Sequence, residues 1–118
     1  MMLRASILVI EDRTDVRSAL ADLLRIAFPG YAVLESGDGA AGLAAARGHC
    51  AVLAIVDATL PDMNGRELVE RLRITDPALD ALLISHEPAS GSIPKDRLHE
   101  ELLPAIERAL ALRKRNSH

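Results

Sequence analysis

The stretch Ser6-Ile-Leu-Val-Ile-Glu-Asp12 runs through four apolar residues directly into two acids. A continuously apolar run of this length is typical of a strand that is buried on both faces, as in a parallel sheet covered by helices. Residues 52–56 and 81–84 repeat this pattern, and residues 32–34 form a shorter apolar run. The sequence therefore predicts four buried strands.

Helix-like stretches separate the predicted strands. In residues 16–27, apolar side chains recur at spacings of three and four, with Thr14 or Asp15 as the expected cap and Pro29-Gly30 as the stop. Three more helices are predicted, over residues 40–47, 66–74 and 99–115. This alternation is typical of an α/β fold with an open parallel sheet and right-handed crossovers.

The segment before Lys95 is too short for another full repeat of this pattern. Only residues 86–94 separate Ser85 from Lys95, whereas a parallel crossover normally takes about a dozen residues or more. Two prolines and a glycine also mark this segment as a loop. We therefore expect a shortened or missing fourth helix and a fifth strand that is short or absent.

Pro104 interrupts the last predicted helix, which is either kinked or begins near Leu103.

The composition bounds the class of protein. The 118 residues fit a single domain (1–118), whose polar, basic tail (113–118) is expected to be frayed. A formal charge of −3 and only two aromatic residues, Phe28 and Tyr31, argue against a nucleic-acid-binding protein. The single cysteine, Cys50, excludes an internal disulfide, and no apolar run is long enough for a membrane span. We expect a cytoplasmic protein.

Polar side chains fall at the carboxyl ends of three predicted strands. Glu11 and Asp12 follow the first strand, Asp57 ends the third, and Ser85 ends the fourth. Because the carboxyl ends of parallel strands share one edge of the sheet, these side chains are expected to converge there. Repulsion between the carboxylates favours a bound cation, and a hard cation with oxygen ligands indicates Mg²⁺.

These residues resemble the receiver domain of bacterial two-component response regulators (CheY-like). The matching stretches are Ile7-Leu-Val-Ile-Glu-Asp12, Val56-Asp-Ala-Thr-Leu-Pro-Asp-Met-Asn-Gly65, Leu83-Ile-Ser85, and Ile93-Pro-Lys95 with Glu100-Glu-Leu-Leu103. The resemblance implies a flavodoxin-like sheet with strand order 2-1-3-4-5. The sequence departs from the family at Ser92, where the family has an aromatic switch residue, and at His86, where it has a small residue.

The resemblance also implies how a phosphoryl group and a metal ion are held. Asp57 would take the phosphoryl group from a phosphohistidine of a sensor histidine kinase or of a histidine phosphotransfer protein. Asp12, Asp57 and the backbone carbonyl of Thr59 would ligate Mg²⁺ directly, and Glu11 would act through bound water.

Two further residues complete the implied site. Ser85 would donate a hydrogen bond to one phosphoryl oxygen, and Lys95 would approach another as a point charge. The chain is therefore interpreted as a stand-alone phosphoacceptor with self-phosphorylation and autodephosphorylation chemistry, rather than a multiple-turnover enzyme. It would signal to a downstream protein target as a monomer or weak dimer, without contacts to nucleic acid or membrane.

Two other functions stay open at this point. A degenerate receiver would bind proteins without being phosphorylated, which the altered surroundings of Lys95 and the bulky His86 favour. A phosphatase of the haloacid-dehalogenase type also uses an aspartyl nucleophile. That chemistry needs an acid two residues after the nucleophile, where this chain has Thr59.

Overall fold

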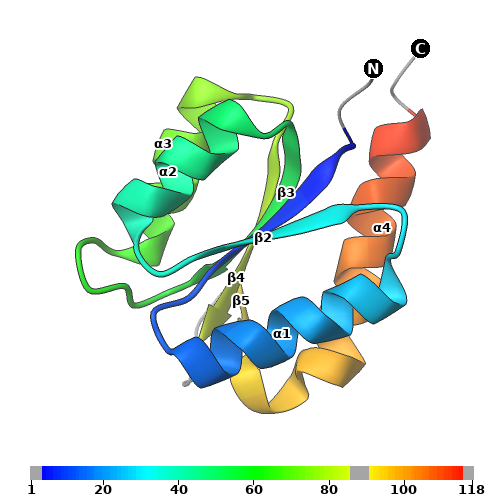
Figure 1. Ribbon diagram of the computed structural model, residues 1–118, viewed down its shortest axis with the longest axis horizontal. Coiled ribbons are helices and arrows are strands. Elements are labelled where there is room, and N and C mark those ends of the chain that lie inside the picture. Colours follow the sequence, from blue (N-terminus) through cyan, green and yellow to red (C-terminus); the bar gives the residue numbers. More distant parts are fainter. Residues whose placement is uncertain (1–3, 86–90, 116–118) are drawn as a thin grey trace.

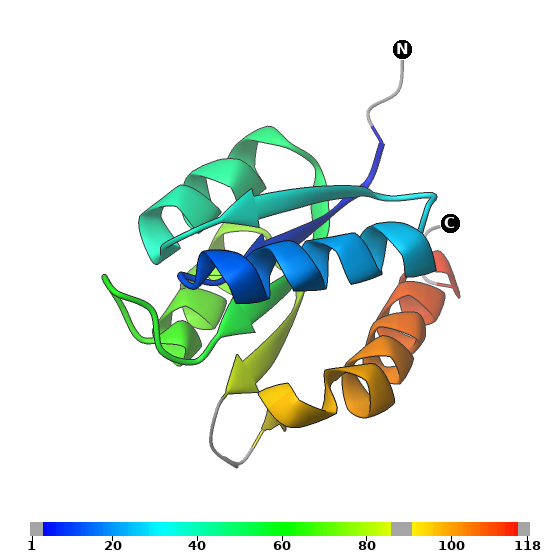
Figure 2. The ribbon, with the colours of Figure 1, turned by 60° about the horizontal axis from the view of Figure 1, so that its bottom comes forward.

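The computed structural model describes residues 4–85 and 91–115. Its centre is a parallel sheet with the strand order β2-β1-β3-β4-β5 (Figure 1, Figure 2). The strands are β1 (Ser6–Ile10), β2 (Ala32–Ser36), β3 (Ala51–Asp57), β4 (Asp80–Ser85) and β5 (Ser92–Pro94). The predicted α/β fold and its strand order are confirmed.

Helices cover both faces of this sheet. They are α1 (Thr14–Ala27), α2 (Gly39–Gly48), α3 (Gly65–Thr75) and α4 (Leu103–Arg115). Figure 1 shows α2 and α3 on one face and α1 and α4 on the other. The predicted caps of the first helix, Thr14 and Asp15, are wrong, because the helix already begins at Thr14 and Arg13 is at its N-cap. No helix in the described part of the chain is long and apolar enough to cross a lipid bilayer.

Successive residues of the central strands point to opposite faces, and both faces are buried. Ile7 and Val9 of β1 belong to the core cluster under α1 and α4, whereas Leu8 and Ile10 belong to the cluster under α2 and α3. All four side chains are fully buried. The burial of both faces explains why the strands are continuously apolar instead of alternating.

The fifth strand is short, as predicted, and pairs with the very end of β4. Its first residue, Ser92, lies beside Leu83, and its last residue, Pro94, lies beside Ser85. The chain therefore travels back along β4 by only two residues, about 7 Å at the usual rise of a strand. The short connection 86–91 suffices for this distance. The predicted loss of a helix before β5 falls mostly outside the described residues.

Two irregular turns join β5 to α4. A 3₁₀ turn covers Lys95–Arg97, and a π-helical turn covers Leu98–Leu102, so the regular helix begins only after them. Pro104 is then in the first turn of α4, and its missing N–H falls where the π-helical turn passes into the regular helix. This late start is the second of the two outcomes predicted for the helix. The helix also includes residues 113–115 of the predicted tail.

Gly65→Ala is expected to destabilise the fold. Gly65 begins α3, and a Cβ at this position would overlap the backbone of Asp57 and Ala58. This backbone is fixed at the end of the sheet, so the free energy of unfolding is expected to fall by about 1–3 kcal/mol. Urea denaturation followed by circular dichroism measures the change. The matched control is Gly48→Ala, where a Cβ meets nothing within 4 Å. An equal loss in both variants would contradict this explanation.

Candidate functional site

Three carboxylates meet at the carboxyl end of the sheet. Glu11 and Asp12 directly follow β1, and Asp57 is the last residue of β3, the strand next to β1. One carboxylate oxygen from each of the three lies within 4.8 Å of the others. The structure thus brings together acids that are far apart in the sequence, as their positions at strand ends predict.

Lys95 contacts this acidic cluster from the side of β5. Its ammonium nitrogen lies 2.5 Å from Glu11 Oε1 and 3.3 Å from Asp57 Oδ2. The side chain of Lys95 is 9% exposed, that of Asp57 is 5% exposed, and that of Glu11 is fully buried. Because Lys95 directly follows β5, even this short strand carries the ammonium group to both acids. Little water screens the attraction between charges in such a place.

The surroundings of Glu11 disfavour its charged form. Burial raises the pKa of the Glu11 carboxyl from an ordinary 4.5 to about 7, and the neighbouring Asp57 carboxyl acts in the same direction. Lys95 and the backbone N–H of Arg13, which donates to Glu11 Oε2 at 3.2 Å, oppose this rise. One lysine thus offsets the charge of the acids only in part. The oxygen-only set of side chains fits a hard divalent cation.

The loop after β3 holds the Asp57 carboxylate in place. The backbone N–H of Thr59 donates to Asp57 Oδ1 at 3.1 Å, while Lys95 Nζ donates to Asp57 Oδ2 at 3.3 Å. Thr59 also forms an isolated bridge with Asn64 across the loop. Each oxygen of the carboxylate therefore has a donor from the protein. The use of the Thr59 carbonyl as a metal ligand stays a prediction.

Ser85 lies at the end of β4, the strand next to the one that carries Asp57. The preceding residue, Ile84, is level with Asp57 in the ladder between the two strands. Ser85 is 8% exposed, and its Oγ lies 3.0 Å from the Oγ of Ser92 on β5. Ser85 thus lies at the same edge as the acids, with its hydroxyl engaged by a second hydroxyl. His86, which follows it, lies outside the described residues.

The middle of the same loop is bound to the start of α2. The Asp62 carboxylate accepts hydrogen bonds from the backbone N–H groups of Gly39 at 2.8 Å and Ala40 at 3.0 Å, which lowers the pKa of Asp62. Gly65 donates from its N–H to the carbonyl of Ala58 at 2.9 Å and so closes the loop. The backbone next to the nucleophile candidate is therefore held from two directions.

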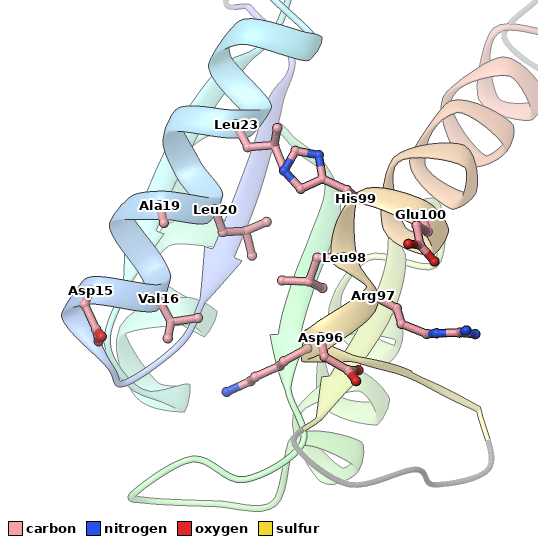
Figure 3. Close-up of a pocket in the computed structure, with 11 residues that line it drawn as sticks. Asp15, Val16, Ala19, Leu20, Leu23, Asp96, Arg97, Leu98, His99 and Glu100 are labelled. Carbon is pink, nitrogen blue, oxygen red and sulfur yellow. The ribbon is translucent and has the colours of Figure 1, made fainter.

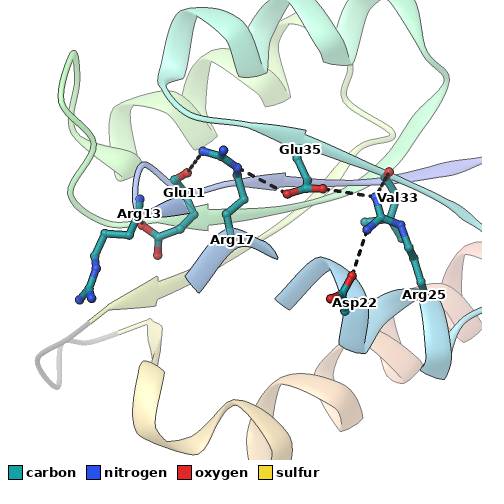
Figure 4. Close-up of polar contacts among 7 residues, drawn as sticks. All are labelled: Glu11, Arg13, Arg17, Asp22, Arg25, Val33 and Glu35. Atoms are coloured by element: carbon teal, nitrogen blue, oxygen red, sulfur yellow. Dashed lines mark hydrogen bonds and ion pairs between the residues drawn. The ribbon is translucent and has the colours of Figure 1, made fainter. Parts of the chain in front are cut away.

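A network of charged residues anchors the backbone of Glu11 (Figure 4). Arg17 on α1 donates to the backbone oxygen of Glu11 at 3.0 Å, and its Nε lies 3.6 Å from Glu35 Oε1 on β2. Glu35 also pairs at 3.3 Å with Arg25, which pairs in turn with Asp22. The exposed Arg25–Asp22 pair adds little, so the mostly buried Arg17 is the main anchor between the end of β1 and the neighbouring elements.

Three residues around the site were not predicted from the sequence. Arg17, Asp62 and Ser92 each act through contact with a residue from another element. Contacts between different elements produce no regular spacing of residues that could be recognised in the sequence. An acid in the loop after Asp57 is a weak signal of a cap for a neighbouring helix, and nothing in the sequence points to the contact of Ser92.

Comparison with known proteins agrees with this arrangement. The model of the response regulator receiver domain family matches residues 7–96. A response regulator receiver protein of Anaeromyxobacter sp. (strain Fw109-5) is 32% identical over 105 residues, which cover 89% of this chain and 43% of that protein. The probable transcriptional regulatory protein TcrX of Mycobacterium tuberculosis is 31% identical over 84 residues, which cover 71% of this chain and 35% of that protein.

A solved structure has the same fold over nearly the whole chain. It is a CheY-like response regulator receiver domain protein from Methanospirillum hungatei JF-1, with a TM-score of 0.85 and 25% identity, and the match covers 98% of this chain and all of that one. This chain spans less than half the length of the two curated relatives. The family match includes the three acids and Lys95. The chain belongs to the receiver domain family of two-component response regulators.

Proposed function

We propose that this chain is a response regulator receiver whose Asp57 accepts a phosphoryl group from a phosphohistidine. The donor is a sensor histidine kinase or a histidine phosphotransfer protein. The observation that carries the proposal is the contact of Lys95 with both Glu11 and Asp57 inside a cluster of three carboxylates. A carboxylate nucleophile beside a buried lysine suits transfer of a negatively charged phosphoryl group.

Mg²⁺ is the cofactor in this proposal. Asp12, Asp57 and the Thr59 carbonyl would hold it directly, and Glu11 would contribute through bound water. The fit rests on the oxygen-only donor set and on the excess of carboxylates over ammonium groups in the cluster. When bound, the ion supplies positive charge that offsets the negative charge of the phosphoryl group. Asp12 is exposed, which leaves a carboxylate of the cluster accessible from solvent.

The side chains around Asp57 position the reacting groups in this proposal. An oxygen of Asp57 forms a bond to phosphorus while the N–P bond of the phosphohistidine breaks, and its electron pair stays on the imidazole. Lys95 offsets charge on the phosphoryl oxygens, the Thr59 N–H steadies the Asp57 carboxylate, and Ser85 donates to a phosphoryl oxygen. Later attack of water on the aspartyl phosphate releases inorganic phosphate and restores Asp57, which is the autodephosphorylation step.

A hollow beside the site suits the phosphodonor protein (Figure 3). It has a volume of about 450 Å³ and lies between α1 and the turns that follow β5. Val16, Leu20 and Leu98 contribute apolar surface, and Lys95 also lines it. Because Lys95 lines the hollow and lies 3.3 Å from Asp57 Oδ2, a partner bound there would lie near the acid. The proposed occupant is therefore the kinase or phosphotransfer protein itself.

The proposal extends to the setting in which the chain works. It includes a downstream protein target, a cytoplasmic location and a monomeric or weakly dimeric state, with no contacts to nucleic acid or membrane. The exposed free thiol of Cys50 suits a reducing compartment. The net charge of −3 opposes binding to nucleic acid.

Asp57→Asn is expected to abolish phosphorylation, because an amide oxygen is a poor nucleophile for this transfer. The chain is incubated with acetyl phosphate and Mg²⁺, and its intact mass is measured. The original chain should gain the mass of one phosphoryl group, and the variant should gain none. Asp80→Asn is the matched control, since it removes an exposed acid at the opposite end of a strand. A phosphorylated Asp57→Asn variant would contradict the assignment, and an original chain that gains no mass would favour the phosphorylation-independent binding module.

Asp12→Asn is expected to weaken Mg²⁺ binding at least roughly tenfold, because it removes one charged ligand of the cluster. Isothermal titration calorimetry with MgCl₂ measures the affinity, since the chain has no tryptophan to report binding. Asp15→Asn, which removes an exposed acid on α1, is the control. Equal affinities of both variants would argue against a role for Asp12 as a ligand.

A further inference from the structure

Ser92 contacts a residue of the proposed site without belonging to the acidic cluster. It begins β5, and its Oγ lies 3.0 Å from the Oγ of Ser85 at the end of β4. The ladder pairs Ser92 with Leu83 and Pro94 with Ser85, so the contact between hydroxyls is a diagonal one between neighbouring strands. Residues two apart on a strand share a face, which is why the two serines project from the same side of the sheet.

We propose that Ser92 is a positioning residue that orients the Ser85 hydroxyl for the phosphoryl group on Asp57. This inference rests on the proposed function, since it requires transfer to Asp57. A serine hydroxyl has one O–H to donate and two lone pairs that accept. When Ser85 gives its O–H to a phosphoryl oxygen, Ser92 still donates to a lone pair of Ser85. The two hydrogen bonds then run in one direction, and each polarises the next.

Burial makes the orientation of this hydroxyl depend on protein partners. Ser85 is 8% exposed, and its contact with Ser92 is partly buried. In water a hydroxyl turns freely between solvent partners, whereas a buried hydroxyl keeps the direction that its protein partners define. A neighbour that keeps the Ser85 O–H directed at the phosphoryl group therefore lowers the entropy that the hydroxyl must lose during phosphoryl transfer.

The short strand β5 would then position two groups at once. Ser92 at its first residue holds the Ser85 hydroxyl, and Lys95, directly after its last residue, places an ammonium group 3.3 Å from Asp57 Oδ2. The hydrogen-bond donor and the positive charge for the phosphoryl oxygens are thereby fixed relative to one another by a strand of three residues.

Ser92→Ala is expected to slow phosphorylation of Asp57 roughly three- to tenfold, the effect of one net hydrogen bond. Ser92→Thr keeps the hydroxyl and is expected to remain within about twofold of the original rate. In a chain that already carries Ser85→Ala, Ser92→Ala is expected to add nothing, because its effect passes through the Ser85 hydroxyl.

The experiment measures phosphorylation rates with acetyl phosphate and Mg²⁺ by intact mass against time, for the original chain, both Ser92 variants, Ser85→Ala and the double variant. Calorimetry with MgCl₂ accompanies it, and the affinity should stay unchanged because neither serine belongs to the acidic cluster. Ser18→Ala, at an exposed serine of α1, is the matched control. If thermal unfolding shows that Ser92→Ala does not fold, Ser92→Cys replaces it, because a thiol has similar size and donates only weakly.

Two outcomes overturn the role of Ser92. One is a Ser92→Ala variant, or its Ser92→Cys replacement, that is phosphorylated at the original rate. The other is a double variant in which the loss from Ser92 adds in full to the loss from Ser85. Failure of the original chain to accept any phosphoryl group overturns the proposed function together with this inference, and so differs from both.

Discussion

Repulsion between carboxylates at one end of the sheet is the constraint that the surrounding parts of the structure must offset. The parallel pairing of β1 and β3 forces Glu11 and Asp57 to the same edge, and burial of both removes the water that would screen them. Lys95 offsets part of this charge through contacts with both acids. The buried acids therefore depend on the short strand β5, because Lys95 directly follows it.

The backbone around the acids is held from several sides because small displacements would change their spacing. Arg17 fixes the carbonyl of Glu11 from α1, and Asp62 fixes the loop after β3 to the first turn of α2. Gly65 lets α3 begin so close to the end of β3 that a Cβ would overlap the Asp57 backbone. These contacts come from α1, α2 and α3, so helices on both faces of the sheet contribute to the geometry of one edge.

The central strands and the meeting of the acids could be predicted from the sequence. Continuously apolar runs indicate strands that are buried on both faces, and acids at the ends of parallel strands indicate a common edge. The run from Ile7 to Asp12 contains both signals. The start of α1 was predicted less well, since Arg13 offers no side-chain cap. The contacts of Arg17 and Ser92 could not be predicted, because each joins side chains of different elements whose separation depends on the packed fold.

The length of the crossover before β5 shows why a rule about connections depends on strand length. About a dozen residues are needed when a parallel strand must return along the whole of its neighbour. Here Ser92 lies beside Leu83, so the chain returns past only the last residues of β4. Those last residues are the ones beside the acidic edge, and the ladder that remains ends directly before Lys95. A strand of three residues is thus long enough to order the site, because its first residue, Ser92, contacts Ser85 and its last residue, Pro94, directly precedes Lys95.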